Sequence, residues 1–466
     1  MASDIPVIVV GAGISGLACA HFLKRVGVRA RLLEADIRPG GVIRTSLQDN
    51  FLVEEGPQSF LCTAELRALV SDLGIEAELL RADPHAPRYV LVDGKLLPVP
   101  LSPFSFLGSS LLSGRSKRAL ARGLWKKTRP PEADESVAAF VRRKFTGELL
   151  DRLVAPMVSG IYAGDPERLS LRAAFPMVHE LEQQYGSLIR GALKRRPKGT
   201  RERPALSSFR RGNETLPRAL AESLGPSLEC GACVTAVHQE QINGRAGFSV
   251  RLERIGLTKT LRCDALVLAM EPHAAARLLS GLSPELPPLV GGIESAPVAE
   301  VALGYERRQL GAPSEGFGFL VPRREALRLL GTVWNSSLFP GRAPEGAALM
   351  TSFVGGALDP DAAFLDAKTL VEMVHADLAR VMCIAGRPVF QSVKQYARAL
   401  PQYNLGHTAR IEAIEKICAG FPGLWLAGNY FEGPAMGACV KRAARVAKSA
   451  REFLAEPRPA VAAKPC

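Results

Sequence analysis

Short apolar runs alternate with a glycine turn and an amphipathic stretch at the start of the chain. The run from Ile5 to Val10 is almost wholly apolar and rich in β-branched residues, which is typical of a buried parallel strand. A glycine turn follows at once, and the apolar residues of 15–26 then recur at helical spacing. A second apolar run, Ala30 to Leu33, predicts another strand. The chain is therefore expected to begin with a strand–turn–helix–strand unit.

Both the helical and the strand period continue further along the chain. Helical patterns occur over 64–73, most of 132–203 including 149–161, 271–279, 366–382 and about 437–454. Strand patterns occur over 208–213, 228–254, 263–270, 296–355 and 424–427, and a hairpin over 87–95 turns at Asp93-Gly94. The strands of 296–355 are expected to form an antiparallel sheet crossed by the helix of 366–382. The predicted fold class is α/β combined with α+β.

The first glycine turn has the residue types of a phosphate-binding turn. Gly11-Ala12-Gly13-Ile14-Ser15-Gly16 lies between the predicted strand and helix, so that Gly11 permits the turn and Gly13 lets a pyrophosphate approach. The helix N-terminus then offers free N–H groups and a partial positive charge. Glu34 falls where a carboxylate accepts hydrogen bonds from a ribose diol. We predict dinucleotide binding, against the alternative of an ordinary turn.

Further glycine turns follow the first one. Arg38-Pro39-Gly40-Gly41 adds a second glycine pair that a nicotinamide-binding unit does not usually carry, and Gly56-Pro57 adds a third turn. Near the end of the chain, Pro434 stands just before the last predicted helix, after several glycines. This arrangement predicts a second helix N-terminus that can face an anion.

The composition limits the class of protein. With 466 residues and 47% apolar residues, the chain is expected to fold into two or three domains with large cores. Its net charge of +13 suits an anionic partner, although a soluble protein from an Arg-rich proteome is the alternative. The nine cysteines are an odd number, and no secretory segment is apparent, so we expect free thiols in a reducing cytoplasm.

No metal site is predicted. Cys230 and Cys233 form a C-x-x-C, but they fall in a predicted strand, where positions i and i+3 point to opposite faces. The seven histidines are dispersed without ligand spacing. We therefore expect neither a zinc site nor catalysis by a metal.

An uncharged stretch precedes a basic one near residue 115. Residues 96–114 carry no charge, but Pro98, Pro100 and Pro103 argue against a spanning helix. Residues 115–129 carry seven basic residues, no acid and Trp125. This pattern predicts peripheral contact with an anionic membrane, with a solvated helix as the alternative. The basic patches at 115–129 and 190–203 lack nucleic-acid motifs, so nucleic acid is not expected as a partner.

With these residues assembled, the chain resembles the flavin-containing protoporphyrinogen oxidases, within the wider monoamine-oxidase-like group, from the first strand to about Leu454. Some parts of the resemblance are widespread among flavoproteins, namely the first turn, Glu34 and Gly40-Gly41. The specific parts are 56–60 (GPQSF), 88–89 (RY), 159–165 (SGIYAGD), 316–322 (GFGFLVP) and 401–407 (PQYNLGH). The run after Gly433, Pro434-Ala435-Met436-Gly437, departs from the family pattern.

The resemblance implies FAD as the cofactor and three domains. A Rossmann-like FAD-binding domain would comprise 1–80, 205–285 and 415–455. An antiparallel-sheet substrate domain would comprise 81–95 and 286–414, and a mainly helical membrane-associating domain would comprise 96–204. The tail, 456–466, is expected to be disordered. The residues implied for FAD are Gly11, Ala12, Gly13, Ile14, Ser15, Gly16, Glu34, Ala35, Gly41, Val42, Arg44, Gly56, Pro57, Gln58, Ser59, Val234, Gly428, Pro434, Ala435 and Met436.

The activity that the resemblance implies is oxidation of protoporphyrinogen IX to protoporphyrin IX in haem biosynthesis. Six electrons would leave as three hydrides to flavin N5, with no catalytic side chain. Dioxygen would then reoxidise the flavin, with a quinone or another carrier as the alternative. Arg88 would pair with a propionate. The residues implied for an apolar substrate cavity are Gly164, Phe317, Gly318, Leu320 and Phe353, each with ordinary core packing as its alternative.

Other functions stay open at this point. Oxidation of coproporphyrinogen III to coproporphyrin III uses the same chemistry on a tetracarboxylate. A flavin amine oxidase usually has a lysine near flavin N5, for which Lys394 is a poor match, and a non-catalytic FAD-binding protein is a further alternative. Expected partners are the porphyrinogen, an anionic membrane surface, a second copy of the chain in a homodimer, and the next haem-pathway enzyme. The expected location is the cytoplasmic side of the cell membrane.

Overall fold

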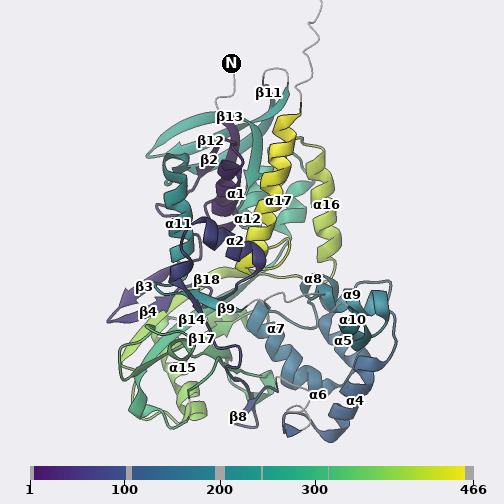
Figure 1. The fold of residues 1–466 in the computed structure, drawn as a ribbon, viewed down its shortest axis with the longest axis vertical. Coiled ribbons are helices and arrows are strands. Elements are labelled where there is room, and N and C mark those ends of the chain that lie inside the picture. The colour runs from purple at the N-terminus through teal and green to yellow at the C-terminus, as the bar shows by residue number, and fades with distance from the viewer. Residues whose placement is uncertain (1–4, 101–107, 195–204, 243–244, 313, 457–466) are drawn as a thin grey trace, which may run out of the picture.

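The computed structural model describes residues 5–100, 108–194, 205–242, 245–312 and 314–456, which are built around two seven-stranded sheets (Figure 1). The predicted tail after residue 456 and parts of 96–114 and 190–203 lie outside these residues. The first sheet has the order β10-β2-β1-β13-β12-β11, and β19 pairs with β13. Its strands are β1 (Ile5–Val10), β2 (Ala30–Leu33), β10 (Leu228–Glu229), β11 (Cys233–Ile242), β12 (Arg245–Arg254), β13 (Leu257–Leu268) and β19 (Leu424–Leu426).

Segments from both ends of the chain form the core on one face of this sheet. Helices α1 (Ile14–Arg25) and α17 (Met436–Ala455) lie side by side, at the purple and yellow ends of the colour scale in Figure 1. Leu17 and Leu23 of α1 pack with Val440 and Ala443 of α17. The predicted strand–turn–helix–strand unit is confirmed, and it is completed by residues more than 400 positions away.

The second sheet, which we call the substrate sheet, has the order β18-β14-β17-β16-β15-β7-β8. Its strands are β7 (Arg88–Val92), β8 (Lys95–Pro98), β14 (Ser295–Glu306), β15 (Gly318–Leu320), β16 (Leu329–Val333), β17 (Ala347–Gly355) and β18 (Phe390–Pro401). The antiparallel prediction is right except between β15 and β7, which run parallel. The predicted hairpin turn at Asp93-Gly94 is confirmed by the β7–β8 register.

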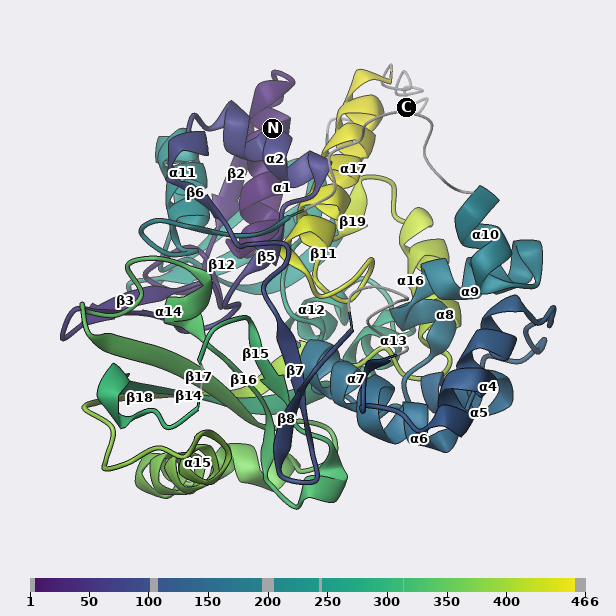
Figure 2. The same cartoon turned by 60° about the horizontal axis from the view of Figure 1, so that its bottom comes forward.

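The two faces of the substrate sheet have different neighbours. Odd-numbered residues of β14, such as Val301 and Leu303, pack with α15 (Ala367–Met382) in one core. Even-numbered residues point to the opposite face, where Ala302 packs with Phe51 and Glu300 meets Gln58. Figures 1 and 2 place α15 on the side of the sheet that lies away from α1 and α17. This face, which we call the even-numbered face after the residues of β14, is therefore turned toward the glycine turns.

A group of helices flanks both sheets. They are α4 (Gly114–Trp125), α5 (Val137–Lys144), α6 (Gly147–Leu149), α7 (Ala155–Tyr162), α8 (Leu171–Ala174), α9 (Pro176–Tyr185) and α10 (Leu188–Lys194). The predicted helix over 149–161 begins as a π-helical turn, Leu150–Val154, before α7. Helix α7 approaches the substrate sheet closely, since a Cβ on Gly160 would lie 2.6 Å from Leu320 Cδ2. Within the described ranges, no helix combines the length and apolarity needed to cross a bilayer.

Several shorter elements complete the fold. Strands β3 (Thr45–Gln48) and β4 (Phe51–Glu54) form a hairpin, and β5 (Phe60–Leu61), β9 (Leu206–Phe209) and β6 (Leu79–Arg81) form a small sheet. The remaining helices are α2 (Ala64–Asp72), α11 (Thr215–Leu224), α12 (Pro272–Leu279), α13 (Leu286–Gly291), α14 (Asn335–Leu338) and α16 (His407–Ala419). The strand predicted over 208–213 ends at Phe209, because the chain turns at Gly212, with φ +90°, into α11.

Candidate functional site

The first glycine turn leaves one open position beside the helix N-terminus. A Cβ on Gly11 would lie 2.5 Å from the carbonyl oxygen of Ala269, and a Cβ on Gly16 would lie 1.9 Å from that of Gly11. These two glycines are therefore required by close packing. A Cβ on Gly13, which precedes α1, would meet no atom within 4 Å. Gly13 thus leaves free space where the N–H groups of α1 can face an anion.

The second glycine turn lies directly against the first. The Gly40 N–H donates a 2.8 Å hydrogen bond to the carbonyl oxygen of Ala12. Gly41 has φ +58°, and a Cβ there would lie 3.4 Å from the Gly13 Cα. Residues from two separate loops therefore converge on the open position at Gly13, which fits a cofactor that lies between them.

The carboxylate of Glu34 is held beside the first turn. Its Oε2 accepts a 2.5 Å hydrogen bond from the Ala12 N–H, and its Oε1 accepts one from the Asp36 N–H at 2.9 Å. The Glu34 carbonyl oxygen accepts a 2.7 Å hydrogen bond from the Ala232 N–H, just before β11. Val234, at the start of β11, follows this contact by two residues. Ala35, which follows Glu34 in the chain, is exposed.

The prediction that Cys230 and Cys233 share a strand is wrong. The chain bends between β10 and β11, because Gly231 adopts φ +70° and donates its N–H to the Asp36 carbonyl oxygen at 2.9 Å. Cys230 lies in the bend and Cys233 begins β11. Among the residues that the structure describes, no three His, Cys, Asp or Glu side chains are grouped as metal ligands.

The third turn packs on the loop that follows Gly41. A Cβ on Gly56 would lie 2.2 Å from the Val42 carbonyl oxygen, so only glycine fits there. Arg44 forms an ion pair with Glu55 at 3.3 Å. The Pro57 carbonyl oxygen accepts a 2.6 Å hydrogen bond from Asn213 Nδ2. The segments 41–44 and 56–59, both predicted for FAD, thus form one unit.

The start of α17 also meets the first turn. Ser15 and Cys439 form a side-chain hydrogen bond, while burial raises the pKa of the Cys439 thiol to about 11. Met436 lies in the same core as Ala12. The N-termini of α1 and α17 therefore converge, and they bring Pro434 and Ala435 close to the first turn. Gly428 lies on the preceding loop, where a Cβ would meet the Tyr430 ring at 2.5 Å.

Four of the predicted substrate residues lie on the same face of the substrate sheet. Residues opposite one another in neighbouring strands project to the same side. The register aligns Leu320, Gly331, Phe353, Glu300 and Lys394 in one row across the face. Arg88 and Gly318 belong to a row two residues away, on the same face. The Arg88 guanidinium carbon lies 5.5 Å from the centre of the Phe317 ring.

Gly164 reaches this face from the helical side. It follows Ala163, which ends α7 with φ +47° and packs with Val298 and Phe353. A Cβ on Gly164 would lie 2.8 Å from Gln402 Oε1, a buried oxygen that has no hydrogen-bond partner among the described residues. All six predicted substrate residues are thus on, or directly beside, the even-numbered face of the sheet.

A buried polar cluster, missed by the sequence predictions, joins the third turn to the substrate sheet. We call it the polar seam, and it comprises Glu54, Gln58, Glu300, Asn335 and Arg342. Gln58 Nε2 lies 3.3 Å from Glu300 Oε2, and Asn335 Nδ2 donates to Gln58 Oε1 at 2.6 Å. Burial raises the pKa of Glu54 to about 7, although Arg342, 3.4 Å away, opposes the rise. The one sequence signal was a single acid, Glu300, within an apolar run.

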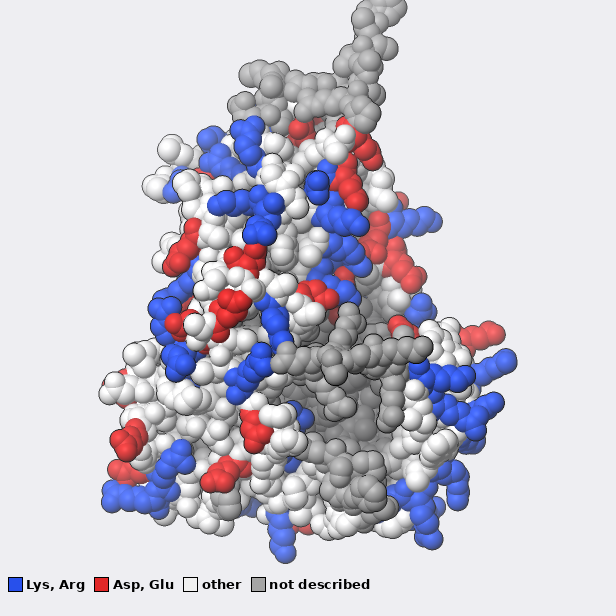
Figure 3. All heavy atoms as spheres, viewed as in Figure 1, with Lys and Arg blue, Asp and Glu red and all other residues white. Residues whose placement is uncertain are grey.

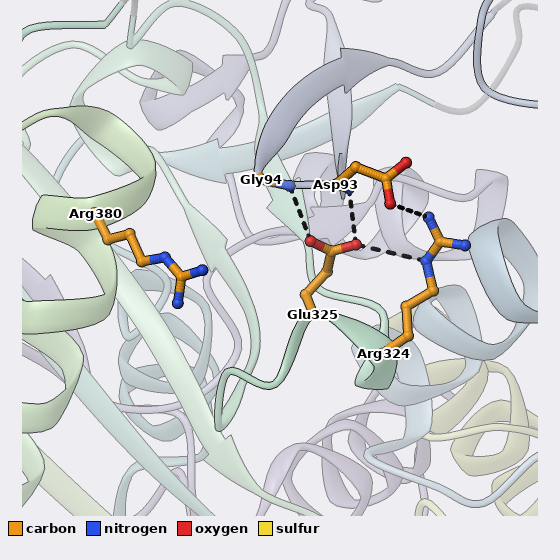
Figure 4. Close-up of a pocket in the computed structure, with 5 residues that line it drawn as sticks. All are labelled: Asp93, Gly94, Arg324, Glu325 and Arg380. Carbon is orange, nitrogen blue, oxygen red and sulfur yellow. Dashed lines mark hydrogen bonds and ion pairs between the residues drawn. The ribbon is translucent and has the colours of Figure 1, made fainter.

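A separate pocket lies at the tip of the β7–β8 hairpin (Figure 4). Glu325 accepts hydrogen bonds from the N–H groups of Asp93 and Gly94, and Arg324 pairs with Asp93 at 3.1 Å. Arg380 of α15 lines the other side. This pocket contains none of the predicted site residues, and its contacts explain how the hairpin turn is fixed.

Comparison with known proteins places this geometry in a family. Residues 14–450 match the family described as flavin containing amine oxidoreductase. The chloroplastic protoporphyrinogen oxidase of Nicotiana tabacum is 34% identical, over 97% of this chain and 86% of that protein. The coproporphyrinogen III oxidase of Bacillus subtilis is 32% identical, over 96% of this chain and 98% of that protein.

A solved structure from Exiguobacterium sp. 255-15 superimposes with a TM-score of 0.80 and 26% identity, covering 98% of this chain and 100% of that one. The family match, over 14–450, includes the second and third glycine turns and the substrate sheet, and both relatives extend over nearly the whole chain. The chain therefore belongs to the flavin-containing amine oxidoreductase family and is an FAD-dependent oxidase.

Proposed function

We propose that this chain oxidises protoporphyrinogen IX to protoporphyrin IX. The observation that carries the proposal is the placement of Arg88, Gly318, Leu320 and Phe353 on the sheet face that is turned toward the glycine turns. An apolar surface with an arginine at its edge, beside a flavin site, suits a tetrapyrrole macrocycle with propionate groups. The name of the tobacco relative, which is similar over almost the full length, supports the same substrate.

FAD would lie across the converging glycine turns. Gly13 and Gly41 leave room for the pyrophosphate, and Glu34 would accept hydrogen bonds from the ribose of the adenosine half. Residues 56–59 and 434–436 would face the flavin end, where the N-terminus of α17 favours negative charge on the reduced ring. When bound, the flavin supplies the acceptor for a hydride. This assignment places the FAD-binding domain in 1–80, 205–285 and 415–455.

The substrate residues would orient the macrocycle. Arg88 is exposed, and a guanidinium can hold a propionate through two parallel hydrogen bonds. The ring of Phe317 supports the Arg88 side chain, while Leu320 and Phe353 present apolar surface. Orientation against the flavin is the main task of such a site, because the cofactor carries the redox chemistry.

Coproporphyrinogen III is the second candidate substrate, since the Bacillus subtilis relative is named for it. A tetracarboxylate would require more basic residues around the cavity than Arg88 alone. The amine oxidase alternative depends on Lys394, whose Nζ lies 3.8 Å from Glu55 Oε2 in an ion pair. A lysine that is held by a carboxylate in this way is a poor candidate for the lysine that such enzymes place at the flavin.

The test compares three compounds, each supplied separately under anaerobic conditions. The purified holoenzyme is mixed with protoporphyrinogen IX, coproporphyrinogen III or a primary amine, and flavin absorbance is followed. We expect bleaching to be fastest with protoporphyrinogen IX. Faster bleaching by coproporphyrinogen III would reassign the substrate, and bleaching by the amine alone would contradict the proposal. Readmitting dioxygen, or adding a quinone, then shows which acceptor restores the oxidised flavin.

Peripheral membrane contact through 96–204 is part of the proposal. Helix α4 exposes Arg115, Arg118 and Arg122 together with Trp125, which is 52% exposed. Figure 3 shows Lys and Arg along the side of the molecule where α4 and α10 lie. Basic residues beside an exposed Trp suit an anionic membrane surface. A homodimer and transfer of the porphyrin to the next haem-pathway enzyme remain predictions.

A further inference from the structure

Three buried carboxyl groups gather where the substrate sheet meets the third turn. Glu54 ends β4, Glu55 follows it, and Glu300 lies in the middle of β14; they are 2%, 8% and 9% exposed. Glu54 faces Arg342 at 3.4 Å, and Glu55 faces Arg44 at 3.3 Å. Glu300, in contrast, forms no ion pair with any residue that the structure describes. It is therefore the carboxyl group of the three whose negative charge is least compensated.

The groups around Glu300 favour its protonated form. Burial raises the pKa of Glu300 well above its usual value, and the charges of Glu54 and Glu55 raise it further. The ammonium group of Lys394, in the neighbouring strand, acts in the opposite direction. Tyr396 also faces Glu300, but its hydroxyl donates to the Glu55 carbonyl oxygen. A carboxyl group in this setting holds its proton more tightly than an exposed one, so a deprotonated Glu300 is a stronger base than an ordinary carboxylate, which suits proton transfer.

Glu300 also lies between the two halves of the proposed site. Phe353 is its direct partner in β17, and Leu320 belongs to the same row, so the three side chains project toward the same face. From the other side, Gln58 Nε2 lies 3.3 Å from Glu300 Oε2. The carboxyl group therefore stands where the predicted substrate surface meets the turn assigned to the flavin end.

We propose that Glu300 accepts the proton released in each two-electron oxidation of the porphyrinogen, an inference that rests on the proposed function. Each step removes a meso C–H hydrogen with its electron pair, which the flavin takes, and one proton, whose bonding pair stays in the macrocycle as part of a new double bond. Over the three steps, two of these protons come from pyrrole N–H groups and the third comes from the remaining meso carbon, so that the product keeps two N–H groups. Each released proton passes to a carboxylate oxygen of Glu300. The proton then reaches solvent past Glu55 and Lys394, which form an ion pair. The side chain of Lys394 is 39% exposed.

The test compares two glutamine variants of the same strand. Glu300→Gln keeps the size and the hydrogen bond to Gln58 but cannot take a proton. Glu306→Gln is the matched control, because Glu306 lies on the same face of β14 with a side chain that is 43% exposed. We expect the anaerobic rate of flavin reduction in the wild type to rise with pH through one ionisation. Glu300→Gln should be slower by about 100-fold or more and should lose this dependence, while Glu306→Gln should retain both.

A second readout needs no substrate. The infrared C=O stretch of protonated carboxyl groups in the holoenzyme should include a band that titrates above the usual carboxyl range and is missing in Glu300→Gln. Wild-type rates in Glu300→Gln, or a Glu300 band that titrates in the usual range, would overturn this inference alone. If Glu300→Gln does not fold, Glu300→Asp replaces it, and the band then decides. A wild-type enzyme that no porphyrinogen reduces would overturn the proposed function as well.

Discussion

A Cβ atom built on Gly41 would lie 3.4 Å from the Cα of Gly13, so two glycine turns from separate loops meet directly. The hydrogen bond from the Gly40 N–H to the Ala12 carbonyl oxygen, 2.8 Å long, fixes this approach. A single glycine turn is compatible with many cofactors. The meeting of two turns at the N-terminus of α1, with the start of α17 beside them, is what makes this site suitable for FAD.

Substitution of two glycines in the first turn should have different effects, one on cofactor binding and the other on stability. Gly13→Ala adds a methyl group where the protein has free space, so we expect a folded protein whose FAD affinity falls at least tenfold, or about 1.4 kcal/mol. Gly16→Ala forces a methyl group to within 1.9 Å of the Gly11 carbonyl oxygen, so it should lower thermal stability instead. Thermal unfolding and FAD titration of both variants test this. A Gly13→Ala protein with unchanged FAD affinity would disprove the assignment.

Arg88 should control substrate affinity rather than folding. We expect Arg88→Ala to weaken porphyrinogen binding by roughly 10- to 100-fold, since a charge-assisted hydrogen bond contributes about 1.5–3 kcal/mol. Arg88→Lys should recover only part of the loss, because an ammonium cannot form the two parallel bonds. Lys95→Ala, on the neighbouring strand, is the control for a lost positive charge. Equal substrate affinity in Arg88→Ala and wild type would contradict the role of Arg88 in substrate binding.

His407 should make the fold less stable in mild acid. Burial lowers its pKa to about 4, while its Nε2 lies 2.8 Å from the Tyr430 carbonyl oxygen. Because the unfolded chain binds this proton at its ordinary pKa of about 6.5, stability is lost as the pH falls from there. At about pH 5 the loss from this group is roughly 2 kcal/mol.

Denaturant unfolding at about pH 7 and pH 5 measures this effect of His407. The difference in unfolding free energy between the two pH values should shrink in His407→Gln. It should be unchanged in His238→Gln, since His238 is exposed. An equal pH dependence in wild type and His407→Gln would contradict the prediction.

Helix α4 should carry the membrane contact. The double variant Arg118→Glu with Arg122→Glu should sediment less with anionic liposomes at low salt, because each basic residue near such a surface contributes about 1 kcal/mol. Added salt should weaken wild-type binding as well. The control is Lys448→Glu with Arg451→Glu on α17, far from α4 in Figure 1. Equal loss in both double variants would indicate only a general charge effect.

The parts of the fold predicted from sequence depend on local signals. Strands Ile5–Val10 and Ala30–Leu33 have the predicted bounds, because apolar runs and the adjoining glycines define them without help from distant residues. Helix α11 was not predicted, since its pattern is short and Pro217 lies within its first turn, where a missing N–H is tolerated. The sequence also does not show that Gly231 ends a strand, because a glycine can occur within one. In the structure, the left-handed conformation of Gly231 breaks the strand before Cys233.

The residues that the sequence named for the candidate site, such as the glycines, Glu34 and Arg88, do not include most of the polar seam. The pairing of Gln58 with Glu300 joins residues 242 positions apart, and it depends on the register of β14 with its neighbours. A shift of one residue would turn Glu300 toward α15 and Val301 toward the glycine turns. No local pattern specifies that register, so the polar seam could be found only from the structure.

The proposed function is tested most directly by counting flavins in an anaerobic titration. Removing six electrons in two-electron steps requires three oxidised flavins for each porphyrinogen. We predict that one equivalent of protoporphyrinogen IX bleaches three equivalents of enzyme-bound flavin and yields the absorption spectrum of protoporphyrin IX. No bleaching with either porphyrinogen, or bleaching without porphyrin formation, would contradict the proposal.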